Sequence, residues 1–160
     1  MKRPPLKWAW RICLAFAGLC AIVFAIWPWY RFHINVTKSL PGHLYLVEVG
    51  RKPSIGDIVA FTWDGGFGYP KGSTFLKHVY GLPGQSVEVH DRSIYIEKKL
   101  VARALERSHR GTPMKTVTPG PIPNQRVFAA TPSPGGFDSR YEVFGLVSFD
   151  SIVGVAHEIF

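Results

Sequence analysis

One uncharged apolar run near the N-terminus constrains this chain more than any other feature. Residues 12–29 hold no charged side chain, and as a helix they would be about 27 Å long. That length approaches the roughly 30 Å hydrocarbon core of a bilayer. Aromatic residues typical of membrane interfaces flank the run at both ends, namely Trp8, Trp10, Trp27, Trp29 and Tyr30. The run therefore predicts one transmembrane helix, which Pro28 ends or kinks.

The charges before this run predict its orientation. No acidic residue occurs among residues 1–30, and the basic residues ahead of the run are Lys2, Arg3, Lys7 and Arg11. The positive-inside bias keeps such a tail in the cytoplasm and exports residues 31–160. A cleaved signal peptide is the alternative, but its small-residue pattern, Ala15-Phe16-Ala17, lies within the run rather than after it. A buried core helix is disfavoured because the run is apolar on every face.

The overall charge narrows the expected partners. The chain carries 19 Lys and Arg against 11 Asp and Glu, a net charge of +8. Such a balance is typical of proteins that bind nucleic acid or an anionic membrane. Removing the four positive charges of the N-terminal tail leaves only +4 on residues 31–160. We therefore expect a lipid bilayer as a partner and no nucleic acid.

Residues 31–160 are predicted to form a mainly β domain. Gly- and Pro-containing turns recur throughout this part of the chain. Between them lie short apolar runs that alternate or are rich in β-branched residues, as strands are: 44–49, 58–63, 74–80, 86–89, 93–96, 126–130 and 152–156. Residues 101–123 lack such periodicity and predict a long loop or insertion. Seven short strands favour a barrel or a folded sheet.

No pattern points to a metal or another cofactor. The six histidines are scattered, without an i, i+4 pair or a nearby thiol. The glycine cluster Gly65-Gly66-Phe67-Gly68 does not precede a helix-like segment, as a phosphate-binding loop would. We expect neither a metal nor a cofactor.

Two segments hold residues that could carry chemistry. Ser39 follows the predicted span closely and stands just before a proline-containing turn into a strand. Lys77 lies inside an apolar strand, where a charged side chain is costly to bury. Taken singly, these residues could be a loop serine and a lysine that extends its amine to water.

Four motifs, taken in order, resemble those of the type I signal peptidases, serine peptidase family S26. They are the Ser-Leu-Pro-Gly-His-Leu-Tyr stretch from Ser39, residues 56–61, residues 75–84, and Asp138-Ser139-Arg140-Tyr141. The first motif is closest to the TraF-type peptidases of conjugative transfer systems. The resemblance covers most of residues 35–156. It implies a signal-peptidase-like folded β domain, residues 31–160, held in the periplasm by an anchor, residues 1–30, in a bacterial inner membrane.

The resemblance also implies a Ser–Lys dyad that cleaves a signal peptide or propeptide from an exported precursor, such as a pilin-like protein. Ser39 would be the nucleophile, and Lys77 the base that activates it. Burial among apolar residues would keep the Lys77 amine neutral near pH 7. The Ser39 N–H and the Thr37 hydroxyl would form the oxyanion hole. Asp138, Ser139 and Arg140 would brace the site, although a surface ion pair is the alternative for the charged two.

The chain departs from the family pattern at one position that bears on the lysine. Gly136 stands where the family has a serine that hydrogen-bonds the lysine amine, so a water, Ser133 or Ser139 would have to replace it. One substitution and one insertion also distinguish the chain: His78 replaces an arginine, and Glu142-Val143 separate the last motif from Phe144-Gly145.

Two other functions remain open at this point. A Ser39–His78–Asp138 triad is conceivable, but His78 and Lys77 are neighbours on one strand and should point to opposite faces. A non-catalytic, membrane-anchored β domain that scaffolds a secretion or transfer complex is the second. The sequence indicates neither the precursor nor an oligomeric state.

Overall fold

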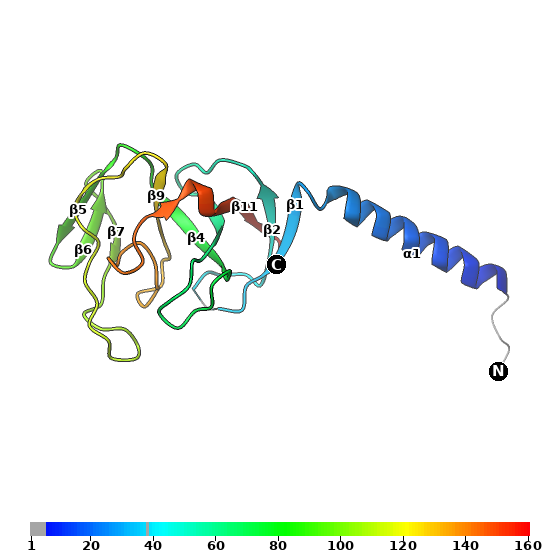
Figure 1. Ribbon diagram of the computed structural model, residues 1–160, viewed down its shortest axis with the longest axis horizontal. Helices are drawn as coiled ribbons and strands as arrows, with labels where there is room; N and C mark the ends of the chain where they lie inside the picture. The colour runs from blue at the N-terminus through cyan, green and yellow to red at the C-terminus, as the bar shows by residue number, and fades with distance from the viewer. Residues whose placement is uncertain (1–5, 38) are drawn as a thin grey trace.

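The computed structural model describes residues 6–37 and 39–160. Helix α1 (Leu6–Ile26) extends away from a β domain (Figure 1), and none of its window Trp8–Ile26 is buried. Its 21 residues give a length of about 31 Å, enough to cross a bilayer. The helix fits a single-pass anchor, and the buried-core alternative is wrong. Lys2 and Arg3 of the predicted tail lie outside the described residues.

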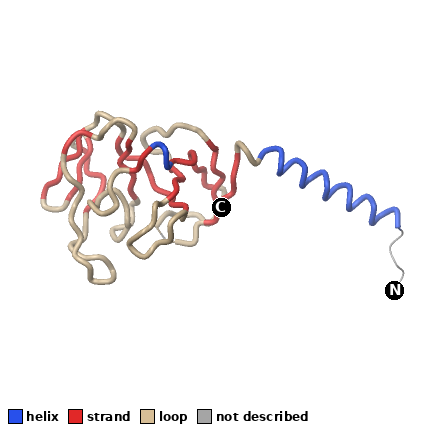
Figure 2. The backbone as a smooth tube through the Cα atoms, in the orientation of Figure 1, coloured by secondary structure: helices blue, strands red, loops and turns tan. Residues whose placement is uncertain are grey.

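Two antiparallel sheets make up the β domain (Figures 1 and 2). The larger has seven strands in the order β1-β2-β11-β3-β4-β9-β10, and the smaller has four in the order β7-β6-β5-β8. The strands of the larger sheet are β1 (Tyr30–Ile34), β2 (Leu44–Val49), β3 (Ile58–Thr62), β4 (Thr74–Gly81), β9 (Arg126–Ala130), β10 (Val147–Ser148) and β11 (Ile152–Glu158). Those of the smaller are β5 (Ser86–His90), β6 (Ser93–Ile96), β7 (Lys99–Arg103) and β8 (Gly120–Pro121). A short 3₁₀ helix, η1 (Phe149–Ser151), precedes β11.

The prediction of a mainly β fold is confirmed. Each of the seven predicted runs corresponds to a strand, with ends that agree within about two residues. Four strands, β1, β7, β8 and β10, were not predicted. The predicted loop, residues 101–123, includes the end of β7 and all of β8, so the stretch between these strands is shorter, residues 104–119. β8 and β10 have two residues each, too few to show a period.

The main core fills the space between the two sheets. Buried side chains from the larger sheet, such as Val59 and Phe128, belong to the same cluster as Ile94 and Ile96 of β6. A smaller cluster comprises Leu40, Tyr45, Val47, Ala60, Leu76 and Ala156, with Leu40 5% exposed. Since Leu40 follows Ser39 directly, this second cluster pins the serine segment against β2, β3 and β4.

Candidate active site

The segment that carries Ser39 connects β1 to β2 and is held at several points. Leu40 packs into the smaller core cluster, and the Tyr45 hydroxyl donates a hydrogen bond to the Pro41 carbonyl. Gly42 has a φ of +71°, a left-handed conformation that glycine adopts at little cost. A Cβ atom there would also lie 2.7 Å from the side chain of Glu158. This segment therefore has a defined path although it contains no helix or strand.

Ser39 and Thr37 lie together in this segment. Their hydroxyl oxygens, Oγ and Oγ1, are 2.8 Å apart, which is a hydrogen bond. Ser39 is half-buried, whereas Thr37 is exposed. The predicted nucleophile and the predicted side-chain donor of the oxyanion hole are thus neighbours in space.

Lys77 is buried in the middle of β4. Its side chain is 6% exposed, and its Nζ atom lies 5.6 Å from the centre of the Phe75 ring. Burial lowers the pKa of the Lys77 amine from 10.5 to about 8; the Asp138 carboxylate opposes this effect and the Arg140 guanidinium adds to it. An amine with this pKa is partly neutral near pH 7 and can accept a proton.

The side chain of His78, the next residue on β4, lies away from the Lys77 amine. Its Nδ1 atom is 3.4 Å from the Gly56 carbonyl oxygen, and its side chain is not among those that line the cleft described below. The alternation of side chains along a strand explains the separation from Lys77. The geometry therefore does not bring together a Ser39–His78–Asp138 triad.

Ser39 and Lys77 lie on the walls of one open cleft of about 530 Å³. Thr37, Phe75 and Phe137 also line it, so the walls are partly apolar. Within residues 6–37 and 39–160, no hydrogen bond joins the Ser39 hydroxyl to the Lys77 amine. Catalytic hydrogen bonds are often long without substrate and tighten when substrate binds. The cleft thus brings the Ser39 hydroxyl and the Lys77 amine, whose pKa is lowered, to one surface.

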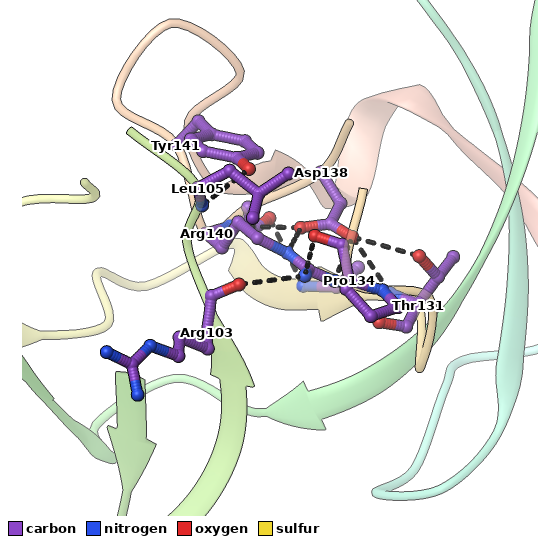
Figure 3. A network of polar contacts seen from close by, with 9 residues as sticks. Arg103, Leu105, Thr131, Pro134, Asp138, Arg140 and Tyr141 are labelled. Atoms are coloured by element: carbon purple, nitrogen blue, oxygen red, sulfur yellow. Dashed lines mark hydrogen bonds and ion pairs between the residues drawn. The ribbon is translucent and has the colours of Figure 1, made fainter. Parts of the chain in front are cut away.

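Asp138 and Arg140 form a buried ion pair beside this cleft (Figure 3). The Arg140 Nε atom donates a hydrogen bond to Asp138 Oδ1 at 2.7 Å, and the Nη2 atom donates one to Asp138 Oδ2 at 2.9 Å. The other guanidinium hydrogens go to the carbonyls of Arg103, Pro134 and Thr131. Every donor of the guanidinium is therefore satisfied. Both side chains are at most 2% exposed, so the surface-pair alternative is wrong.

The space around Gly136 explains the absence of a side chain there. A Cβ atom at Gly136 would lie 2.1 Å from Thr131 Oγ1 and 2.7 Å from Asp138 Oδ2. The buried Thr131 hydroxyl, which donates to Asp138 Oδ2, occupies that space instead. Of the two replacement serines, Ser133 lines the cleft, whereas the Ser139 hydroxyl accepts a hydrogen bond from the Ala129 N–H.

Two residues of the site were not singled out from the sequence. Thr131 follows β9, and extending the β4–β9 register by one residue brings it opposite Lys77. Only the strand pairing reveals this neighbourhood. Asn35 is 8% exposed and hydrogen-bonds Thr37. The sequence signal for it was only the presence of an asparagine four residues before the serine. In the described part of the chain, no three His, Cys, Asp or Glu side chains cluster as metal ligands would.

Comparison with known proteins identifies the class to which this fold and site belong. A family model described as "Signal peptidase, peptidase S26" matches residues 6–160. The chain therefore belongs to the signal peptidase family, peptidase S26.

Two relatives match almost the whole chain. The "Probable conjugal transfer protein TraF" of Sinorhizobium fredii is 33% identical over 91% of this chain and 86% of its own length. The "Conjugal transfer protein TraF" of Agrobacterium fabrum is 30% identical over 92% and 93%, respectively. A solved structure of a signal peptidase I from Enterococcus faecalis V583 is 27% identical over 66% of this chain and 97% of that chain, with a TM-score of 0.42.

Proposed function

We propose that this chain is a membrane-anchored serine endopeptidase that cleaves a signal peptide or propeptide from an exported precursor. Ser39 is the nucleophile and Lys77 the general base. The observation that carries the proposal is the burial of Lys77 in the cleft that Ser39 also lines, with its pKa lowered to about 8. Burying this amine destabilises the fold, so its position is best explained by catalysis.

The dyad works by a proton transfer that accompanies attack. The neutral Lys77 amine takes the proton of the Ser39 hydroxyl while Oγ forms a bond to the scissile carbonyl carbon. This step requires the Ser39 hydroxyl to turn from Thr37 towards Lys77 when substrate fills the cleft. The resulting ammonium then gives its proton to the leaving amine, and water hydrolyses the acyl-enzyme by the reverse sequence.

The developing oxyanion needs hydrogen-bond donors. The Ser39 N–H and the Thr37 hydroxyl supply them in this proposal, and the close approach of the two side chains supports that assignment. The Asp138–Arg140 pair acts at a distance, by holding the chain that follows β9 through Thr131 and Pro134 and by setting the charge around Lys77. Ser139 contributes to this brace through its bond with Ala129.

The names of the two relatives support a conjugative transfer system as the setting. In this setting the substrate is a pilin-like or other precursor of the transfer machinery. α1 crosses the bacterial inner membrane with its N-terminus in the cytoplasm, and the β domain lies in the periplasm.

The test replaces each dyad member in the full-length, membrane-inserted protein. Ser39→Ala and Lys77→Ala should each slow processing of a co-expressed pilin-like precursor by on the order of a thousandfold or more. Processing is followed as a mobility shift on gels, and the new N-terminus is identified by mass spectrometry. Ser54→Ala, at an exposed serine, and His78→Ala should process normally.

The outcomes separate the functions left open by the sequence. Normal processing by both dyad variants refutes the dyad. Loss of processing in His78→Ala, with the protein still folded, would favour the triad. Intact transfer of DNA by cells that carry Ser39→Ala would favour a scaffold that requires the folded domain and no cleavage.

A further inference from the structure

The Asn35 side chain makes four hydrogen bonds within the Ser39 segment. Its Nδ2 atom donates to the carbonyls of Leu40 and Gly42, at 3.3 and 3.2 Å. Its Oδ1 atom accepts from the Thr37 N–H at 3.2 Å and from the Thr37 hydroxyl at 3.0 Å. Every donor of the carboxamide and both lone pairs of its oxygen are therefore used. The side chain ties the residues before Ser39 to those after it.

These contacts fix the direction of the bonds that reach Ser39. Nδ2 faces two carbonyl oxygens, so the carboxamide has one satisfactory orientation, with Oδ1 towards Thr37. Because Oδ1 can only accept, the Thr37 hydroxyl gives its single proton to Asn35. In the 2.8 Å contact between the two hydroxyls, Ser39 must then be the donor. The bonds run in one direction, from Ser39 to Thr37 and from Thr37 to Asn35.

We propose that Asn35 is a positioning residue for acyl transfer, which sets the place and the proton direction of the Thr37 and Ser39 hydroxyls. The inference rests on the proposed function of Ser39. Asn35 lines the same cleft, but in this proposal it acts on the loop rather than on the substrate. It acts through Thr37, whose oxygen it holds 2.8 Å from the attacking atom, and through the loop carbonyls that follow Ser39.

The two bonds to Thr37 have different tasks. When substrate arrives, the Thr37 hydroxyl must turn its proton from Asn35 to the forming oxyanion. The bond from the Thr37 N–H to Oδ1 does not depend on that rotation, so the backbone of Thr37 stays in place while its hydroxyl changes partner. At the same moment Ser39 passes its proton to Lys77 and forms the bond to the carbonyl carbon.

Asparagine is the side chain that fits these requirements. An aspartate would still accept from Thr37 but would point an anionic oxygen at the carbonyls of Leu40 and Gly42. An alanine would leave all four groups without these partners. The matched control is Asn124, the other asparagine of the chain, which is exposed.

The experiment measures steady-state cleavage by the full-length protein in detergent, with the precursor used to test Ser39. Asn35→Ala should lower kcat on the order of tenfold to a hundredfold with little change in KM, somewhat less than the loss of a direct oxyanion donor. Asn124→Ala should match the unchanged protein. Thr37→Val removes the hydroxyl but leaves the bond between the Thr37 N–H and Asn35.

A double variant distinguishes positioning from a purely structural role. Because Asn35 acts partly through the Thr37 hydroxyl, Asn35→Ala with Thr37→Val should lose clearly less kcat than the product of the two single losses. Independent effects that multiply would overturn the proposal, as would a kcat for Asn35→Ala within about twofold of the unchanged protein. If Ser39→Ala also cleaves normally, the proposed function has failed instead.

A second variant covers the case in which Asn35→Ala does not fold. Asn35→Asp keeps the acceptor for Thr37 and adds a negative charge to the wall of the cleft that holds Lys77. It should lower kcat and also shift the rise of kcat with pH to higher pH, because an anion favours the ammonium form. An unchanged kcat on the high-pH plateau, where Lys77 is neutral in both proteins, would refute the positioning role.

Discussion

Replacing Lys77 with methionine should abolish activity and stabilise the protein at pH 7. The perturbation removes a buried amine and keeps an unbranched side chain of similar length. In the folded protein the pKa of Lys77 is lowered from 10.5 to about 8. Each unit of pKa difference corresponds to about 1.4 kcal/mol, so protonated Lys77 destabilises the fold by about 3 kcal/mol at pH 7.

The sign of the pH dependence follows from proton counting. Between pH 8 and 10.5 the unfolded chain keeps the Lys77 proton while the folded protein has lost it. The unfolded state binds more protons, so the free energy of unfolding rises with pH in this window. From pH 7 to pH 9.5 the unchanged protein should gain about 2 kcal/mol relative to Lys77→Met, which has no group to titrate.

The assay is urea unfolding of the full chain in detergent micelles at both pH values, followed by the far-UV circular dichroism of the β domain. Lys52→Met, at an exposed lysine, is the matched control. If the stability difference between Lys77→Met and the unchanged protein alters by less than about 0.5 kcal/mol between the two pH values, Lys77 is not desolvated and the argument for its role as a base fails.

Three further predictions follow from the same surroundings. Initial rates of precursor cleavage should rise with pH and level off above about 8, as neutral Lys77 accumulates; a flat profile from pH 6 to 9 would contradict this. Asp138→Asn should lower the free energy of unfolding by about 3–5 kcal/mol, because the Arg140 charge stays buried without its counter-ion; calorimetry showing a loss below about 1 kcal/mol would refute the account. Gly136→Ser should lower the melting temperature, because the added side chain meets the Thr131 hydroxyl. Adding Thr131→Ala should recover part of the loss. Equal melting temperatures for Gly136→Ser and the unchanged protein would contradict this prediction.

Much of the architecture could be predicted because its signals are local. The uncharged run that forms α1 is visible in any window of the chain, and the alternating runs of β2 and β6 predict strands without knowledge of their partners. β10 could not be found in this way, since its two residues are ordered only by pairing with β9. The exposed β1 is likewise held by its ladder with β2 rather than by a pattern of its own.

The same distinction between local signals and tertiary contacts applies to the residues of the candidate site. Ser39 and Lys77 could be selected because each is unusual in its own segment, a serine before a proline turn and a lysine among apolar residues. The burial of Asp138 could not, because it depends on Arg140 and on carbonyls from two separate parts of the chain, Arg103 and the loop of Thr131 and Pro134. Charge and spacing alone leave a surface pair and a buried pair equally possible.

By itself, the sequence determined a helix that fits a membrane anchor, the β class of the domain and the two residues proposed to react. These depend on hydrophobicity and periodicity, which act between near neighbours along the chain. Only the tertiary structure decided that Ser39 and Lys77 line one cleft, that Thr131 occupies the space beside Gly136, and that Asn35 holds Thr37. Those relations arise from strand register and from the folded path of a loop, because such contacts are set by packing across the whole domain.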